Sequence, residues 1–164
     1  MDENRVRALA LLDELGIPYD LSEHPAVYTI AEMDALQMER EEEIAKNLFL
    51  RDKKGKRHFL VMLKKDKTAD LALLAERIGC DRLSFASEER LGRYPGLVKG
   101  AVTPLGVVND TEALVEVVLD ADLSGCRRIG MHPCDNTATV WLEFSDVERF
   151  VRKNGNRVQI FPVP

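Results

Sequence analysis

Two stretches, GAVTPLGVVND at Gly100–Asp110 and GMHPCDNTAT at Gly130–Thr139, decide how the fold of this chain is interpreted. Each begins at a glycine, carries a proline three or four residues later, and shows neither a helical nor an alternating apolar pattern. Glycine and proline hold the backbone in fixed shapes outside regular ladders, so its N–H and C=O groups can face a ligand. We therefore expect two ligand-facing loops, supported by the rest of the chain.

The segments around these loops predict a mixture of helices and strands. Apolar spacing, capping residues and helix-ending glycines predict helices at residues 3–15, 29–38, 70–78, 87–93 and 145–153. Thr68 is expected to cap the third helix, and Ser145 with Glu148 forms a capping box for the last. Short apolar or β-branched runs predict strands at 17–21, 47–50, 58–63, 114–119, 137–144 and 158–161, and residues 128–131 lead into the second loop.

The order of these elements indicates the fold class. The strands cluster centrally without a regular strand–helix–strand rhythm, and the runs on either side of Gly55 predict a hairpin. We expect an α+β fold with a mixed, mostly antiparallel sheet that curls into a pseudo-barrel with flanking helices. The 164 residues are 45% hydrophobic and contain no repeat or linker, which predicts a single domain over residues 1–164.

Composition narrows the functional class. The net charge of −5 argues against a protein that coats nucleic acid, and we expect no DNA partner. The three cysteines, Cys80, Cys126 and Cys134, have no CxxC spacing, which favours reduced thiols. The charged N-terminal segment does not fit a signal peptide, and no apolar run approaches the ~18 residues of a membrane span. A soluble, cytoplasmic protein without a membrane partner is expected.

Residues 51–67 reverse the sign of the overall charge. Eight lysines and arginines, among them Lys53, Lys54, Lys56 and Arg57, face only two aspartates in this segment. Such a hairpin can bind phosphates and release their counterions. It can equally be a solvated edge that its charges keep from aggregating.

Lys46 and His132 are the other candidates for chemistry. Lys46 lies between an acidic stretch and the apolar residues 48–50, where it can present an ammonium at a pocket or neutralise a nearby glutamate. His132 precedes a proline, so its backbone is expected to be extended and its side chain presented to a ligand or to the backbone. His24 and His58 offer no metal-ligand spacing, and no nucleophile motif or nucleotide-binding glycine pattern occurs. We expect a binding pocket with no metal and no cofactor.

Three motifs in order, AKNLFL at 45–50, GAVTPLGVVND at 100–110 and GMHPCDNTATVWL at 130–142, resemble the YbaK/ProX family of editing deacylases. This family is related to the editing domain of bacterial prolyl-tRNA synthetase, and the resemblance runs along the whole chain. The segment from His132 to Thr137 is more similar to the ProX branch, which removes alanine from tRNA(Pro), than to the cysteine-removing YbaK branch.

The resemblance implies roles for particular residues. Lys46 matches the lysine that holds phosphate or ribose of the terminal adenosine, and Gly100 with Pro104 matches a loop whose backbone faces the aminoacyl carbonyl. His132 matches the pocket histidine, so Lys46, Gly100 and His132 are the implied catalytic residues. The implied substrate contacts are Asn47, Phe49, Val102, Thr103, Pro104, Met131, Asn136 and Thr137, and the implied tRNA contacts are Lys53, Lys54, Lys56 and Arg57.

The implied reaction is hydrolysis of the ester between an amino acid and the 3′ end of tRNA. An activated ester needs no protein nucleophile if water is positioned and the oxyanion is stabilised. The implied partners are the acceptor end of mischarged tRNA(Pro) and, transiently, prolyl-tRNA synthetase or an elongation factor. Preference for cysteine or serine esters, or a non-catalytic tRNA- or synthetase-binding module, are the alternatives.

Overall fold

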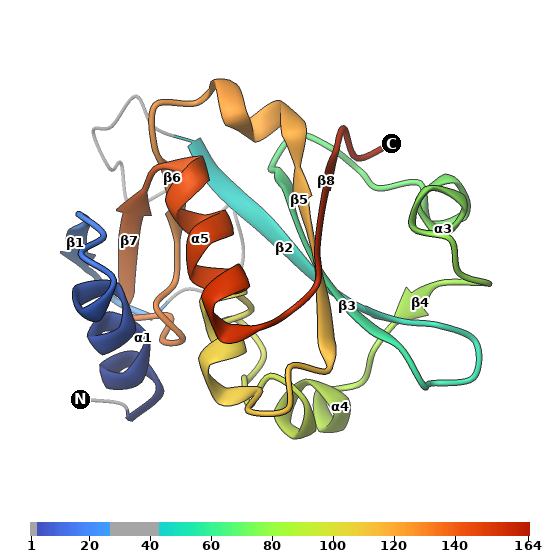
Figure 1. Cartoon of the computed structure of the whole chain (residues 1–164), viewed down its shortest axis with the longest axis horizontal. Helices are drawn as coiled ribbons and strands as arrows, with labels where there is room; N and C mark the ends of the chain where they lie inside the picture. Colours follow the sequence, from blue (N-terminus) through green and yellow to red (C-terminus); the bar gives the residue numbers. More distant parts are fainter. Residues whose placement is uncertain (1–2, 27–42) are drawn as a thin grey trace.

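The computed structural model describes residues 3–26 and 43–164, which contain eight strands in one sheet (Figure 1). The strand order is β1-β7-β6-β2-β3-β5-β8, and the short β4 pairs with β2. Four neighbouring pairs are antiparallel and three are parallel. The predicted mixed sheet is therefore confirmed, and β1 and β8 stand at the two ends of an open sheet in the described part of the chain. The bounds are β1 Asp20–Glu23, β2 Glu43–Arg51, β3 His58–Lys64, β4 Ser84–Phe85, β5 Val115–Asp120, β6 Ile129–Met131, β7 Ala138–Leu142 and β8 Val158–Phe161.

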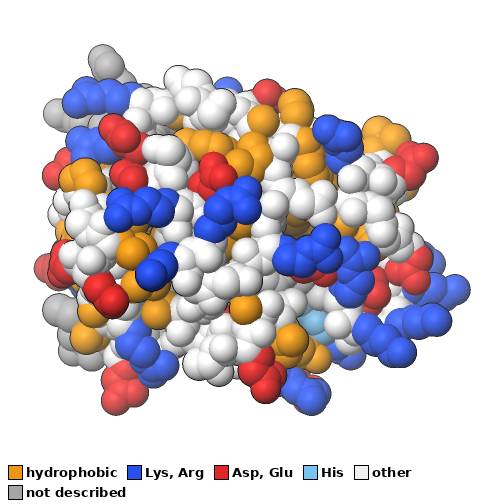
Figure 2. Space-filling model, in the orientation of Figure 1, with side chains coloured by type: hydrophobic (Ala, Val, Ile, Leu, Met, Phe, Trp, Pro, Cys, Tyr) orange, Lys and Arg blue, Asp and Glu red, His pale blue; other side chains and the backbone are white. Residues whose placement is uncertain are grey.

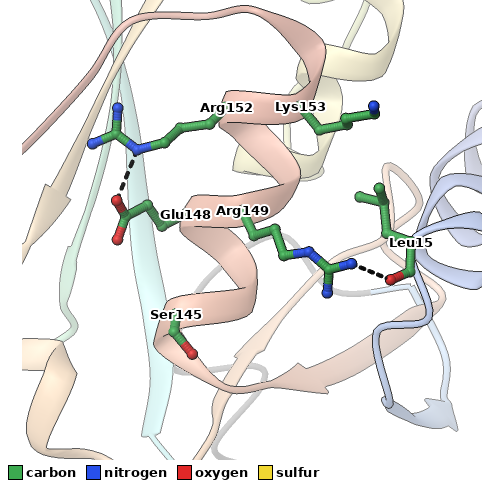
Figure 3. A pocket seen from close by; sticks show the side chains of 6 residues that line it. All are labelled: Leu15, Ser145, Glu148, Arg149, Arg152 and Lys153. Atoms are coloured by element: carbon green, nitrogen blue, oxygen red, sulfur yellow. Dashed lines mark hydrogen bonds and ion pairs between the residues drawn. The ribbon is translucent and has the colours of Figure 1, made fainter.

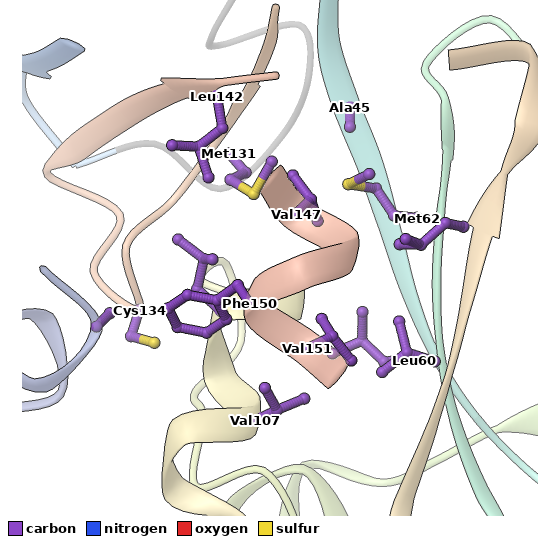
Figure 4. Close-up of a cluster of buried hydrophobic side chains, with 14 of the residues drawn as sticks. Ala45, Leu60, Met62, Val107, Met131, Cys134, Leu142, Val147, Phe150 and Val151 are labelled. Atoms are coloured by element: carbon purple, nitrogen blue, oxygen red, sulfur yellow. The ribbon is translucent and has the colours of Figure 1, made fainter. Parts of the chain in front are cut away.

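Helices flank the sheet as expected, and they divide the core in two. The helices are α1 Glu3–Glu14, α3 Leu71–Ile78, α4 Glu88–Arg93 and α5 Phe144–Asn154, with 3-10 turns η1 Pro104–Asn109 and η2 Ala121–Gly125. The larger core joins α1, α5 and η1 to one face of the sheet, with Val151 of α5 beside Leu60 of β3 and Phe150 on the other side of the helix, toward Cys134 (Figure 4). The smaller core joins α3 to the other face, where Leu74 and Leu63 are fully buried.

The β2–β3 hairpin is the longest pairing in the sheet. Its register runs from Ala45 opposite Lys64 to Arg51 opposite His58. The Asp52 carboxylate closes the turn, because its Oδ1 accepts hydrogen bonds from the N–H groups of residues 56 and 57 at 2.9 and 3.2 Å. Gly55 supplies the left-handed conformation that the turn needs, with φ of 69°. The predicted hairpin around Gly55 is confirmed.

Helix starts show where local sequence is ambiguous. The predicted cap at Ser87 is confirmed, since its side chain accepts a hydrogen bond from the N–H three residues later. The prediction for Thr68 is wrong, because Asp70 makes the equivalent bond at the start of α3. Ser145 does not cap α5 either. The helix has already begun at residue 144, and its cap residue Glu143 makes no side-chain capping bond.

Two further predictions need correction. The first strand runs over residues 20–23 instead of 17–21, since its register is set by pairing with β7. The loop expected at residues 100–110 becomes a 3-10 turn from Pro104 onward, and the Thr103 side chain accepts a bond from the N–H of Leu105. The helix predicted at residues 29–38 lies outside the described residues.

Candidate functional site

Part of one edge of β2 has no strand partner among the described residues. β3 pairs with one edge of this strand, so β6 and β4 share the other. β6 pairs there only with Glu43 and Ile44, and β4 only with Leu50 and Arg51. Among the described strands none pairs with this edge between residues 45 and 49, although the Phe49 carbonyl accepts a bond from Ala86 N at 3.0 Å. We call this stretch the β2 opening. Within this stretch Ala45 and Phe49 are buried, whereas residues 46–48 are half-buried.

Lys46 lies at the β2 opening, on the face away from α5. Its strand neighbour is Leu63, which belongs to the core under α3. Lys46 Nζ donates a hydrogen bond to the backbone oxygen of Lys67 at 3.0 Å, and no carboxylate of the described residues pairs with it. A half-buried ammonium that no described carboxylate pairs with can contact a phosphate or a ribose oxygen.

Strand alternation places His132 on this same side of the sheet, because Gly130, two residues before it, pairs with Ile44, two residues before Lys46. The structure also adds a residue that the sequence did not indicate as a contact of His132. The rings of His24 and His132 are 6.0 Å apart, centroid to centroid. His24 follows β1, and its N–H donates to the carbonyl of Thr137 at 3.0 Å. Its Nε2 lies 2.8 Å from the hydroxyl of Thr139. Sequence analysis considered His24 only as a possible metal ligand, because its contact with His132 depends on the β1–β7 pairing, which no local pattern indicates.

The hydrogen bond of His132 fixes its tautomer. Nδ1 lies 2.8 Å from the carbonyl oxygen of Ala138, and a carbonyl can only accept, so Nδ1 carries the proton. The lone pair of the neutral ring is then on Nε2. Burial lowers the pKa of His132 below its ordinary value, and this outweighs the opposite effect of the bond to Ala138. Near neutral pH the residue is therefore a hydrogen-bond acceptor and a proton acceptor.

The loop that carries His132 is held by an ionic contact with α1. The buried Arg5 pairs with Glu23 at 2.6 Å and lies 3.6 Å from Asp135. The Asp135 carboxylate accepts bonds from the N–H and the hydroxyl of Thr137 at 2.9 and 2.7 Å. Burial alone would raise the pKa of Asp135, but these bonds and the charge of Arg5 hold it below its usual value. The hydroxyl of Thr137, predicted to contact substrate, is thus engaged within its own loop, whereas Asn136 is half-buried.

The predicted residues Asn47, Phe49 and Met131 lie on the α5 side of β2. Asn47 is paired with Met62, which belongs to the larger core together with Phe49 and Met131. Asn47 Oδ1 is buried and has no hydrogen-bond partner in the described part of the chain. A buried acceptor without a partner costs about 1–3 kcal/mol, so this atom is a candidate contact for a donor on a ligand. Phe49 instead stacks on the imidazole of the buried His58, with ring centroids 5.8 Å apart. It is therefore a core residue.

The Gly100–Pro104 segment also packs on the α5 side. Gly100 has φ of 87°, a conformation that favours glycine. Thr103 and Pro104 are buried, whereas Gly100 and Val102 are only half-buried. The end of this stretch is structural, since the buried Asp110 accepts bonds from two backbone N–H groups and from an asparagine side chain. The part of the loop available to a ligand is therefore its first half.

The basic hairpin divides into free and engaged cations. Lys53, Lys54 and Lys56 are exposed at its tip. Arg57 forms a two-pronged bond with Glu116, with both N···O distances at 2.8 Å. Figure 2 shows lysine and arginine side chains gathered at the end of the molecule where Figure 1 places this hairpin. The lysines can reach an external anion, whereas the charge of Arg57 is already neutralised.

A separate groove of about 510 Å³ lies between α5 and the end of α1 (Figure 3). Its cations are partly engaged, because Arg149 donates to the Leu15 carbonyl and Arg152 pairs with Glu148 at 2.7 Å. It contains none of the predicted site residues.

The described residues contain neither a metal centre nor a membrane span. None of their clusters of histidine, cysteine and acidic side chains could hold a metal ion. None of the helices within residues 3–26 and 43–164 has the length and apolar composition needed to cross a bilayer.

Known proteins are similar to this chain in sequence and in fold. The family model described as the aminoacyl-tRNA editing domain matches residues 24–150. The chain is 53% identical over 148 residues, 90% of each chain, to the prolyl-tRNA editing protein ProX of Acetoanaerobium sticklandii. It is 38% identical over 144 residues to prolyl-tRNA synthetase associated domain-containing protein 1 of Danio rerio, covering 87% of this chain and 78% of that one. A crystal structure described as a candidate trans-editing enzyme for prolyl tRNA synthetase has a TM-score of 0.75 at 21% identity, covering 98% and 97% of the two chains.

Proposed function

Because the chain belongs to the aminoacyl-tRNA editing domain family, we propose that it is a trans-editing deacylase that hydrolyses Ala-tRNA(Pro). The observation that carries this proposal is the 53% identity over 90% of both chains with a prolyl-tRNA editing protein. The site supports it, since Lys46, which no described carboxylate pairs with, and the neutral His132 fall on one face of the sheet.

The reaction is the addition of water to an ester. The water oxygen attacks the aminoacyl carbonyl carbon and gives a tetrahedral oxyanion. The bond from this carbon to the ribose oxygen then breaks, and the proton lost by water is returned to that oxygen. The products are free alanine and tRNA with an intact terminal ribose. The neighbouring ribose hydroxyl can help to position the water, which makes catalysis partly substrate-assisted.

We divide the proposed tasks between the two faces of the sheet at β2, with Lys46 and His132 on one face and Gly100 on the other. Lys46 holds phosphate or ribose of the terminal adenosine by charge. His132 accepts a hydrogen bond from the attacking water through Nε2. The backbone of Gly100 faces the oxyanion, where one preorganised donor is typically worth about 10²–10³ in rate.

Selection of the amino acid comes from pocket size in this proposal. A synthetase site built for proline rejects the smaller alanine poorly, because a missing methylene is worth only about 1–3 kcal/mol. A second, smaller pocket corrects this. We assign its walls to Val102, Thr103 and Pro104 on one side and to Met131, Asn136 and Thr137 on the other. Asn47 Oδ1 is the proposed acceptor for the α-ammonium, and Phe49 supports the wall from within the core.

The remaining parts of the proposal concern partners and location. We take residues 1–164 as one editing domain that binds the acceptor end of tRNA(Pro) in the cytoplasm. Lys53, Lys54 and Lys56 are the proposed tRNA contacts, with Arg57 positioning the turn through Glu116. Prolyl-tRNA synthetase or an elongation factor is a transient partner that delivers the mischarged tRNA.

The deciding experiment measures deacylation of Ala-, Cys- and Ser-tRNA(Pro) by the purified protein, with Pro-tRNA(Pro) as the matched control. We expect alanine to be released fastest and proline to be retained. Faster release of cysteine or serine would transfer the activity to those esters. Binding of tRNA without turnover of any ester at micromolar protein would leave only a binding module.

A further inference from the structure

Two arginines meet at the turn of the β2–β3 hairpin. A Cβ atom built on Gly55 would lie 2.8 Å from Arg90 Nη2 and 3.1 Å from Arg51 Nη2. Arg51 comes from the end of β2 and Arg90 from α4, so the fold brings the two guanidinium groups to the same point. Like charges this close repel each other, and a bound anion would relieve that repulsion.

The groups that hold these arginines leave their charges uncompensated. Arg51 donates to the backbone carbonyls of Asp52 and Lys53 at 3.1 and 3.0 Å. Arg90 Nη1 donates to the Gly55 carbonyl at 3.1 Å and to Nε2 of His58 at 3.0 Å. Neither guanidinium forms an ion pair with a carboxylate of the described residues. This contrasts with Arg57 in the same turn, which is neutralised by Glu116.

His58 is a neutral acceptor for Arg90. Its imidazole is buried and stacks on Tyr94, with ring centroids 3.8 Å apart. Burial and the neighbouring Arg90 lower the pKa of His58 to about 4, so it carries no charge at neutral pH. The ring therefore orients the guanidinium and leaves its charge in place. A carboxylate in the same position would cancel that charge. Both arginines are only half-buried and remain open to an external ligand.

We propose that Arg51 and Arg90 form a phosphate-binding pair over Gly55 that grips the backbone of the tRNA substrate. The exposed Lys53, Lys54 and Lys56 at the same tip extend the positive surface along the phosphates of the tRNA backbone. Arginine suits this task because its planar fork can bind a phosphate with two hydrogen bonds. The inference rests on the proposed function for the identity of the ligand, and it adds α4 to the tRNA contact.

The test compares wild-type protein with the double variant Arg51→Gln/Arg90→Gln. Binding of uncharged tRNA(Pro) is measured by fluorescence anisotropy across a salt series. Loss of two phosphate contacts should weaken binding about tenfold or more at low salt and reduce the slope of log affinity against log salt by about one to two. Arg152→Gln, which removes one charge from α5, is the matched control and should bind as wild type does.

Two hydrolysis assays separate this inference from the proposed function. Alanyl-adenosine reports on the ester site alone, since it is too short to span both sites, whereas Ala-tRNA(Pro) requires both. The pair is supported if the variant has a raised KM for Ala-tRNA(Pro) and unchanged hydrolysis of alanyl-adenosine. If wild type hydrolyses neither ester, the proposed function fails, and the anisotropy series alone still decides the pair.

Folding is checked by thermal unfolding. Because Arg90 also contacts a buried ring, the single variant Arg51→Gln is measured beside the double one; its bonds lie within its own turn. Wild-type affinity and salt slope in a folded Arg51→Gln protein would overturn the pair.

Discussion

The ammonium of Lys46 donates a hydrogen bond to the backbone carbonyl of Lys67, with 3.0 Å between Nζ and the oxygen. Lys67 is itself fixed, because its own Nζ pairs with Asp120 at 2.9 Å and with Asp122 at 2.7 Å. Burial alone would raise the pKa of Asp120, but Lys67 and backbone N–H groups lower it, so the carboxylate stays charged. The carbonyl that orients Lys46 is therefore held by a partly buried ion pair, while no described carboxylate pairs with the Lys46 ammonium.

Replacing Lys46 by alanine tests this arrangement. We expect kcat/KM for Ala-tRNA(Pro) to fall about 10²-fold or more, since a charge-assisted contact to the substrate is lost. The midpoint of thermal unfolding should change little, because only one hydrogen bond to a carbonyl disappears. Lys153→Ala, which removes an exposed lysine of α5, is the control. A Lys46→Ala protein with wild-type kcat/KM would remove Lys46 from the site.

Acid should inactivate the enzyme through His132. Protonation of Nε2 removes its lone pair, so the water loses its acceptor. Burial places the pKa of this ring below the ordinary value of about 6.5, so kcat/KM should be constant from neutral to weakly alkaline pH and fall only in more acidic solution. His132→Asn should lower the rate at neutral pH and abolish this acidic limb. An unchanged limb in that variant would assign the titration to another group.

How far the sequence predicts this molecule depends on how local each determinant is. The hairpin follows from two apolar runs around Gly55, and Ser87 caps its helix through a bond three residues away. Thr68 fails as a cap because Asp70, two residues later, offers an equally suitable oxygen. Several capping side chains close together cannot be ranked without knowing where the helix packs.

The candidate site was predicted in part, for the same reason. Lys46 and His132 stand within recognisable motifs, whereas His24 reaches His132 only through the β1–β7 pairing. Alternation along a strand could have separated Lys46 from Asn47, because neighbouring residues of a strand point to opposite faces. The opening in the sheet could not be predicted, since it depends on where the partners of β2 end.

Stability should fall in mild acid because of His58. The unfolded chain binds a proton at this residue below about pH 6.5, whereas the folded protein binds it only near its lowered pKa of about 4. The contribution is complete above pH 6.5 and is lost as the pH falls toward 4, on the order of 2–3 kcal/mol. Urea unfolding of wild type and His58→Gln at pH 7 and pH 4.5 measures it. The variant keeps an acceptor for Arg90 but does not titrate, so its loss on acidification should be smaller. Equal losses in the two proteins would exclude His58 as the cause.

Packing against Trp141 should make Gly130 intolerant of a side chain. A Cβ atom at Gly130 would lie 2.7 Å from Cζ3 of this indole, which is rigid and 1% exposed. Gly130→Ala must therefore displace the ring or bend β6, at a cost of about 1–3 kcal/mol. Gly125→Ala is the matched control, because a Cβ there meets nothing within 4 Å, and its effect should stay within about 0.5 kcal/mol. Chemical denaturation of both variants gives the two values. Equal stability of Gly130→Ala and Gly125→Ala would contradict the close packing of β6 on Trp141. Because β6 leads directly into the loop of His132, the destabilised variant should also lose deacylase activity before it unfolds, whereas Gly125→Ala should keep it.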